Sequence, residues 1–235
     1  MDTDRRFDRP VPITTVSAES RLFARVYALM GLGLVLTAMV AWYTASSPAL
    51  LQVVLGNRMV FFGLMIGELA LVAWLSGLIG KMAASTATGV FLFYSALNGL
   101  TLSVIVLVYT SGSVASTFFV TAGAFGALSA YGFATKRSLT GLGSFCFMGL
   151  IGVLLASVVN IFVRSNMLEF VLSVAGVIVF AGLTAYDTKK LKMLAQEVDA
   201  DSEAGKRASV VGALALYLDF INLFLFLLRL FGRRR

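Results

Sequence analysis

Two aspartates near the C-terminal end are the residues of this chain whose type and position suggest chemistry. Asp187 lies in GLTAYDTKKLK and Asp219 in LYLDFINLFLFLLRLFG, inside or at the edge of the last two apolar stretches of membrane-spanning length. An ionised carboxylate in hydrocarbon costs about 2.5 to 3.5 kcal/mol, so an acidic residue there indicates a functional site. Two such residues within reach of each other would form a titratable cation site.

The spacing of the two aspartates predicts that they meet. The polar segment QEVDADSEAGKR separates the two apolar stretches, and residue 203, the midpoint between the aspartates, lies inside it. If the stretches are antiparallel helices, residues equidistant from the turn lie at the same height. We therefore expect Asp187 and Asp219 to face each other within the membrane.

Paired carboxylates would provide a pH gate in a chain that has no histidine. Two carboxylates in one site cannot both ionise cheaply, so the pair should bind and release protons as a unit. A shared proton would link the two helices at low pH. Two ionised groups would repel each other or bind a hard cation, and oxygen ligands favour calcium or magnesium over zinc. Asp187 and Asp219 are thus also the candidate metal ligands.

Each aspartate has a structural alternative. Asp187 is followed by Lys189 and Lys190, and it could be a helix-end residue paired with Lys190 at i+3. Asp219 has no neighbouring lysine of this kind, because residues 212–231 are apolar apart from Tyr217, Asn222 and Arg229. Its structural alternative is an interhelical hydrogen bond.

Glu68 and Arg229 are two further charges within apolar stretches. We expect them to form a supporting ion pair, since long side chains can close a vertical gap between them by snorkelling. Such a pair could serve stability alone or act as an extracellular gate.

The composition requires a membrane to position these residues. The chain is 59% hydrophobic and 13% charged, against roughly 45 to 50% and 25% in soluble proteins. Apolar runs of about 20 residues with short polar breaks predict an all-α bundle of seven transmembrane helices. Small residues at helix-packing spacing are Gly31, Gly33, Gly63, Gly67, Gly123, Gly126, Gly149 and Gly152. The expected spans are 22–45, 58–80, 86–109, 114–135, 141–163, 168–190 and 208–231.

Three regions are expected along the chain. Residues 1–21 form a disordered cytoplasmic tail, 22–232 the transmembrane domain, and 233–235 a basic tail. The net charge of +7 resides in short flanks rather than on one face, which favours anionic lipid over nucleic acid as the partner. The last span could instead be re-entrant, because its RRR end would otherwise lie outside; we favour a lipid-headgroup anchor for that end.

The distribution of basic residues places the N-terminus in the cytoplasm. Twelve lie on the inner side in that orientation and six on the outer. The inner set is Arg5, Arg6, Arg9, Arg21, Lys81, Lys136, Arg137, Lys189, Lys190, Lys192, Lys206 and Arg207; the outer set is Arg58, Arg164, Arg229, Arg233, Arg234 and Arg235.

At the two aspartate segments the chain resembles the bacterial branch of the Bax inhibitor-1 family of membrane proteins. The resemblance rests on FAGLTAYDTKKLK (180–192), LYLDFINLFLFLLRLFG (216–232) and RVYALMGLGLVLTA (25–38). It implies a seven-helix fold in the bacterial inner membrane, with the last helix central and wrapped by the other six. It also implies a pH-sensitive calcium leak gated by an aspartate pair, which maps onto Asp187 and Asp219.

One position departs from the family pattern. Some bacterial relatives place an arginine near the inner end of the second helix, where it contacts the aspartates, whereas this chain reads WLSGLIGKM. Lys81 is the only nearby cation and therefore the candidate latch. Lysine lacks the guanidinium fork, so its closed-state contact would differ.

Two other functions compete with the leak. A non-transporting regulator would bind other membrane proteins, such as a protease or a stress-response partner. An intramembrane aspartyl protease would also carry a Tyr-Asp pair like Tyr186 and Asp187, but its second aspartate sits in GxGD, where this chain has YLDF. We therefore expect no enzymatic activity and no cofactor, with calcium or another cation as the bound or transported species.

Overall fold

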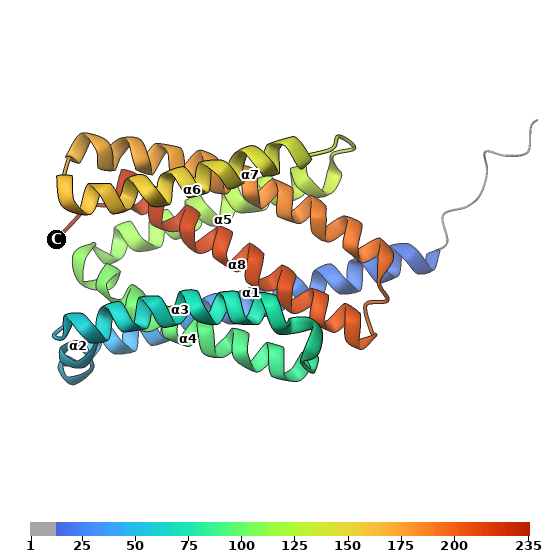
Figure 1. Cartoon of the computed structure of the whole chain (residues 1–235), viewed down its shortest axis with the longest axis horizontal. Helices are drawn as coiled ribbons and strands as arrows, with labels where there is room; N and C mark the ends of the chain where they lie inside the picture. Colours follow the sequence, from blue (N-terminus) through green and yellow to red (C-terminus); the bar gives the residue numbers. More distant parts are fainter. Residues whose placement is uncertain (1–12) are drawn as a thin grey trace, which may run out of the picture.

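The structure is a computed structural model that describes residues 13–235 as a bundle of helices (Figure 1). Seven of them are long and apolar enough to cross a membrane, as predicted. In chain order the elements are α1 (Ile13–Ser46), α2 (Pro48–Val54), α3 (Arg58–Leu78), the 3-10 turn η1 (Ile79–Lys81), α4 (Ala84–Val108), α5 (Ser111–Ala134), α6 (Thr140–Val163), α7 (Asn166–Glu197) and α8 (Glu203–Phe231).

The short helix α2 is an α-helix that the apolar pattern did not predict. Pro48 occupies its first turn, where a missing N–H costs nothing, and the Ser47 hydroxyl caps it by accepting a hydrogen bond from the Leu50 N–H at 3.5 Å. The sequence break SSP therefore starts a helical turn between two spans rather than an irregular loop.

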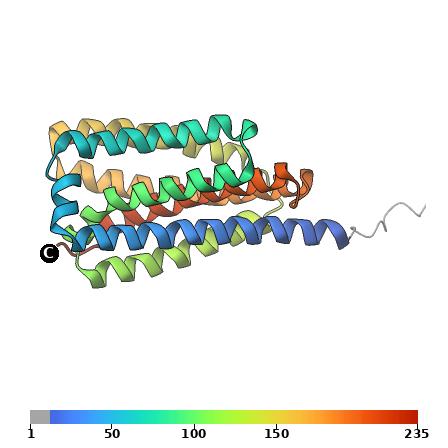
Figure 2. The same cartoon turned by 90° about the horizontal axis from the view of Figure 1, so that it is seen from below.

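The last helix lies at the centre, as expected (Figure 2). In its most apolar stretch, 72% of the residues of α8 are buried, against 6% in α3 and 11% in α6. The expectation that six helices wrap α8 is wrong, however. The helices α1, α4, α5 and α7 pack along α8, whereas α3 packs mainly on α4 and α6 on α7. Because α3 and α6 are outer helices on different neighbours, a space remains between them beside α8.

The N-terminal end of the bundle begins earlier than predicted. Helix α1 starts at Ile13, so the expectation of a disordered tail up to residue 21 is wrong for residues 13–21; residues 1–12 lie outside the described part. The physical reason is a contact with the α7–α8 turn, where Arg21 and Arg25 each lie 3.3 Å from the carboxylate of Asp201. These exposed ion pairs are individually weak, and they join α1 to the α7–α8 turn at the end of the extension.

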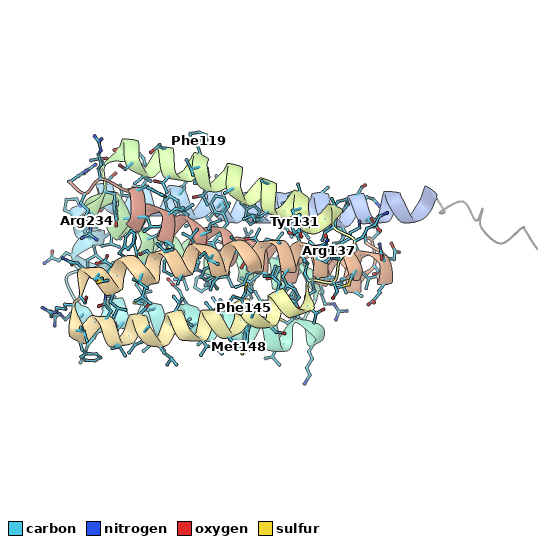
Figure 3. All side chains as sticks on the ribbon, turned by 90° about the horizontal axis from the view of Figure 1, so that it is seen from above. Phe119, Tyr131, Arg137, Phe145, Met148 and Arg234 are labelled. Atoms are coloured by element: carbon cyan, nitrogen blue, oxygen red, sulfur yellow. The ribbon has the colours of Figure 1, made fainter. Side chains whose placement is uncertain are left out.

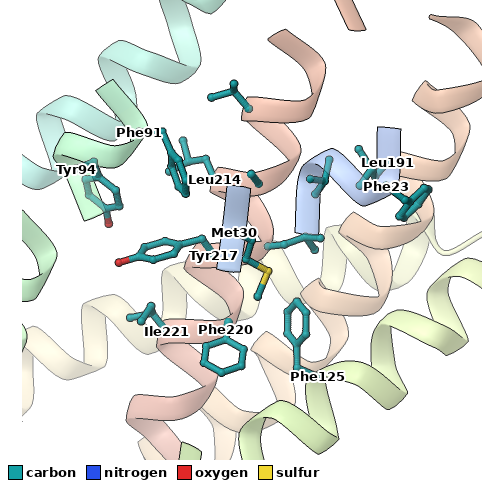
Figure 4. Close-up of a cluster of buried hydrophobic side chains, with 14 of the residues drawn as sticks. Phe23, Met30, Phe91, Tyr94, Phe125, Leu191, Leu214, Tyr217, Phe220 and Ile221 are labelled. Carbon is teal, nitrogen blue, oxygen red and sulfur yellow. The ribbon is translucent and has the colours of Figure 1, made fainter. Parts of the chain in front are cut away.

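The core beside α8 is organised around Tyr217 (Figure 4). This side chain is fully buried, and its ring meets Phe91 and Tyr94 edge-on at centroid distances of 5.6 and 5.9 Å. Its hydroxyl lies 2.7 Å from Thr37 Oγ1 on α1 and accepts a hydrogen bond from Asn98 Nδ2 on α4 at 3.0 Å. Since Thr37 Oγ1 already donates to the α4 backbone, the tyrosine hydroxyl is the donor between them. One phenol thus holds α8 to two neighbours.

Removing this hydroxyl should weaken the bundle. We expect Tyr217→Phe to lower the free energy of unfolding by about 1 to 3 kcal/mol, because the buried Asn98 amide loses its acceptor. Denaturant unfolding in detergent micelles measures the change. Tyr131→Phe is the matched control, since Tyr131 is 52% exposed on the side of α5 and should tolerate the substitution. Equal stability of the two variants would contradict the role of the Tyr217 hydroxyl.

Glycines permit close helix contacts at some predicted positions and at others that were not predicted. A methyl group added at Gly33 would meet Phe91 at 2.7 Å, and one added at Gly149 would meet Val179 at 2.8 Å, as expected. A methyl group added at Gly132 would overlap the backbone carbonyl of Ala185 on α7, and one added at Gly176 would meet the Phe226 ring at 2.6 Å. The predicted packing role of Gly63 and Gly67 is wrong, because nothing lies within 4 Å of an added methyl at either. Both are on the peripheral helix α3, and glycine spacing alone does not distinguish an inner from an outer face.

The C-terminal end is held by protein contacts. Helix α8 is uninterrupted to Phe231 and is long and apolar enough to cross a membrane, which favours a full span over a re-entrant segment. Figure 3 places Arg234 and Arg137 at opposite ends of the bundle. The Thr110 N–H donates to the Arg233 carbonyl at 3.1 Å, and Arg234 Nη2 lies 3.0 Å from Glu169 Oε1. The RRR segment is therefore attached to the α4–α5 junction and to α7. Its role as a lipid-headgroup anchor stays a prediction.

Candidate functional site: an aspartate pair beside the central helix

Asp187 and Asp219 line the same cavity. It has a volume of about 1340 Å³ and lies between α3 and α6, where α7 and α8 form its inner wall. From the helix ends at Glu197 and Glu203, Asp187 lies about 15 Å and Asp219 about 24 Å along the helix axes at 1.5 Å per residue. The structure thus brings together the two residues that the sequence singled out.

Asp219 is a buried acid without full hydrogen-bond satisfaction. The residue is 4% exposed, and among the residues described its Oδ2 atom has no hydrogen-bond partner. Buried polar atoms are satisfied in the large majority of cases, and exceptions call for an explanation such as a bound ion or a functional role. The alternative of a structural interhelical hydrogen bond is not realised at this oxygen.

Asp187 is half-buried and lies one turn before Lys190, which lines the same cavity. In the described part of the chain no ion pair within 4 Å joins Asp187 to Lys190, so the helix-end alternative is not realised as a direct contact. The neighbouring Tyr186 ring packs against Gly143 of α6, where an added methyl would meet the ring at 2.5 to 2.7 Å. This contact, which sequence reasoning missed, fixes α6 against α7 beside the pair.

The predicted ion pair between Glu68 and Arg229 is not formed. Glu68 Oε1 accepts a hydrogen bond from Thr101 Oγ1 of α4 at 3.0 Å. The Arg229 guanidinium is exposed, and its Cζ lies 5.5 Å from the centroid of the Phe226 ring. The described residues include no salt bridge between the two. The physical reason is that α3 packs on α4 rather than on α8, so Glu68 faces an α4 hydroxyl.

The candidate latch Lys81 does not reach the cavity. It is exposed at the end of η1 and is absent from the lining, whereas Lys190 belongs to it. A cation three residues after Asp187 on the same helix was visible in the sequence. The geometry therefore makes Lys190, and not Lys81, the cation nearest to the aspartate pair within the cavity.

The cavity offers oxygen ligands but no compact metal cage. Within residues 13–235 no group of three or more histidine, cysteine or acidic residues is arranged to hold a metal ion. Calcium takes 6 to 8 oxygen ligands, so two aspartates would need water or neutral oxygens to complete the shell. Neutral polar side chains do line the cavity, namely Ser144, Ser157, Asn160 and Asn222. This donor set suits weak, transient binding of a cation better than a resident ion.

Comparison with known proteins places the chain in a family of membrane proteins. A profile described as "Inhibitor of apoptosis-promoting Bax1" matches residues 19–235, which include all seven spans. The chain belongs to the Bax inhibitor-1 family. It is accordingly a multi-pass membrane protein. The resemblance found at the two aspartate segments extends over almost the whole of this chain.

Bacterial relatives align over nearly their entire length. The chain is 52% identical to the inner membrane protein YbhL of Escherichia coli over 232 residues, covering 98% of this chain and 99% of the relative. It is 43% identical to an uncharacterised protein of Borreliella burgdorferi, covering 92% and 94% respectively. It is 41% identical to the uncharacterised protein RP147 of Rickettsia prowazekii, covering 92% and 90%.

Proposed function

We propose that this Bax inhibitor-1 family member is a pH-sensitive cation leak, with calcium as the favoured ion and no enzymatic activity. The observation that carries the proposal is the buried, unpartnered Oδ2 of Asp219 in a cavity shared with Asp187. A polar atom in this state is stabilised when it binds a proton or a cation. Both ligands compete for the same two carboxylates, which couples cation binding to pH.

The proposed gate works through the charge of the pair. At low pH one shared proton removes the repulsion between the carboxylates and links α7 to α8. As pH rises the proton leaves, and two negative charges in a poorly solvated site either separate the helices or attract a divalent ion. Tyr217 holds α8 to α1 and α4, so we expect the displacement to fall on α7. Cation flux should therefore rise with pH.

The proposed location is the bacterial inner membrane with the N-terminus in the cytoplasm. The E. coli relative is named an inner membrane protein, and basic residues concentrate at the N-terminal end of the bundle. At that end Lys189 Nζ donates to the Thr135 carbonyl at 2.6 Å and Lys192 Nζ to the Phe133 carbonyl at 3.0 Å. Lys190 and the aspartate pair then lie on the cytoplasmic side of the cavity.

Reconstitution of the purified chain into liposomes tests the function. Calcium entry, followed with a trapped fluorescent indicator, should exceed that of protein-free liposomes and should increase as the pH is raised, because the carboxylate pair then loses its shared proton. Potassium entry measured in the same way reports ion selectivity. A folded, correctly inserted protein that gives no cation flux at any pH would refute the leak and favour the non-transporting regulator.

A further inference from the structure

The cavity has an open side that faces the surrounding membrane. Its rim is formed by exposed apolar side chains from the two outer helices, among them Leu69 on α3 (72% exposed) and Phe147 and Val158 on α6 (59% and 54%). The helices α3 and α6 make no substantial contact with each other, and Figure 1 shows α8 between them. In a bilayer this opening meets hydrocarbon, so an acyl chain can enter it.

The opening is long enough for a lipid tail. Its lining on α6 runs from Gly143 to Ile161, which corresponds to about 27 Å at 1.5 Å per residue. The hydrocarbon core of a bilayer is about 30 Å thick, so the groove covers most of that depth and more than one leaflet. A chain descending from the end at Asn160 would pass Asn222 and approach Asp219.

Charged groups gather where the headgroup of such a lipid would lie. Arg229, Arg234 and Glu169 line the cavity at the C-terminal end of α8. Glu169 pairs with Arg234 at 3.0 Å, which leaves the exposed Arg229 guanidinium as the excess positive charge of this mouth. Arginine binds phosphate through two parallel N–H groups, so a phosphate ester complements this end of the groove.

We propose that the cavity binds one phospholipid from the leaflet on the Arg229 side. The phosphate contacts Arg229, and one acyl chain lies along the opening between α3 and α6. The charge of the mouth favours this occupant over the apolar face of a second copy of the chain. This binding goes beyond the cation leak and holds whether or not cations pass. The acyl chain of the bound lipid closes the open side of the cavity next to Asp219. The carboxylate is thereby shielded from the surrounding bilayer.

Native mass spectrometry of the purified full-length protein tests the proposal. After detergent exchange and addition of phosphatidylglycerol, the wild type should retain one lipid per chain. Arg229→Gln should lower the apparent affinity about tenfold, the effect of losing one charge-assisted contact. Arg58→Gln is the matched control, because Arg58 is an exposed arginine at the same end that does not line the cavity; it should retain lipid like the wild type.

A second pair of variants tests the acyl-chain site without touching a charge. Ser157→Phe adds a ring to the lining of α6 and should also reduce retention, whereas Leu155→Phe, at a 64% exposed position of α6 outside the cavity, should not. The proposal is overturned if Ser157→Phe and Leu155→Phe retain lipid equally, or if Arg229→Gln matches Arg58→Gln. The proposal is also overturned if the wild type forms lipid-free dimers and Ser157→Phe does not. That result would identify a second copy of the chain as the occupant of the groove.

Discussion

Replacing Asp219 with asparagine is expected to abolish the pH dependence of calcium flux. In the wild type, the ratio of flux at high pH to flux at low pH should be well above one, since loss of the shared proton leaves two like charges in one site. Asparagine at 219 is neutral at every pH and resembles the protonated acid in size. The ratio should fall to about one, with flux fixed near the low level of the closed state.

Two measurements separate this effect from general damage. Glu197→Gln removes an exposed carboxylate near the end of α7 and should keep the wild-type pH profile. Asp219→Asn should also unfold no more easily than the wild type, because it replaces a carboxylate with an unpartnered buried oxygen by a neutral amide. A variant that folds normally and still shows the wild-type pH profile would exclude Asp219 from the gate.

The second large effect is expected at the α5–α7 contact. Gly132→Leu should destabilise the bundle by about 3 kcal/mol, because even the first carbon of the new side chain overlaps the Ala185 backbone, which cannot rotate away as a side chain can. Ala185 lies two residues from Asp187, so the strain should also displace the aspartate pair. We expect weaker pH dependence of flux in any fraction that folds.

Gly123→Leu is the matched control on the same helix. Gly123 is exposed, and an added methyl group there meets nothing within 4 Å, so leucine should be tolerated. Denaturant unfolding in micelles compares the two variants under one set of conditions. Equal unfolding midpoints would show that α5 and α7 can separate without cost, which would contradict the close contact at Gly132.

Among the described residues, helix α8 carries one with a fully hydrogen-bonded side chain close to one whose carboxylate lacks a partner at one oxygen. Tyr217, two residues before Asp219, has its hydroxyl bonded to both α1 and α4, whereas Asp219 Oδ2 has no partner in the part of the chain that the structure describes. The costly carboxylate is thus held in place by neighbours that do not neutralise it. This is the arrangement expected where stability is given up for function.

The sequence alone determined the class of the protein, its seven spans and its two principal acids. These features follow from local chemistry. A run of about 20 apolar residues must cross the bilayer as a helix, and an aspartate inside such a run is costly wherever the helix packs. The antiparallel order of the last two spans, which follows from the short turn between them, was enough to bring Asp187 and Asp219 to one cavity.

Only the tertiary structure decided which helices surround the pair and which charges reach it. Spacing along the chain does not specify the rotation of a helix about its axis or the neighbour it packs against. Glu68 therefore meets Thr101 instead of Arg229, and Lys190 instead of Lys81 lines the aspartate cavity. The open groove between α3 and α6 likewise follows from the packing of each on a different partner, because two apolar helices in lipid have no hydrophobic drive to meet each other.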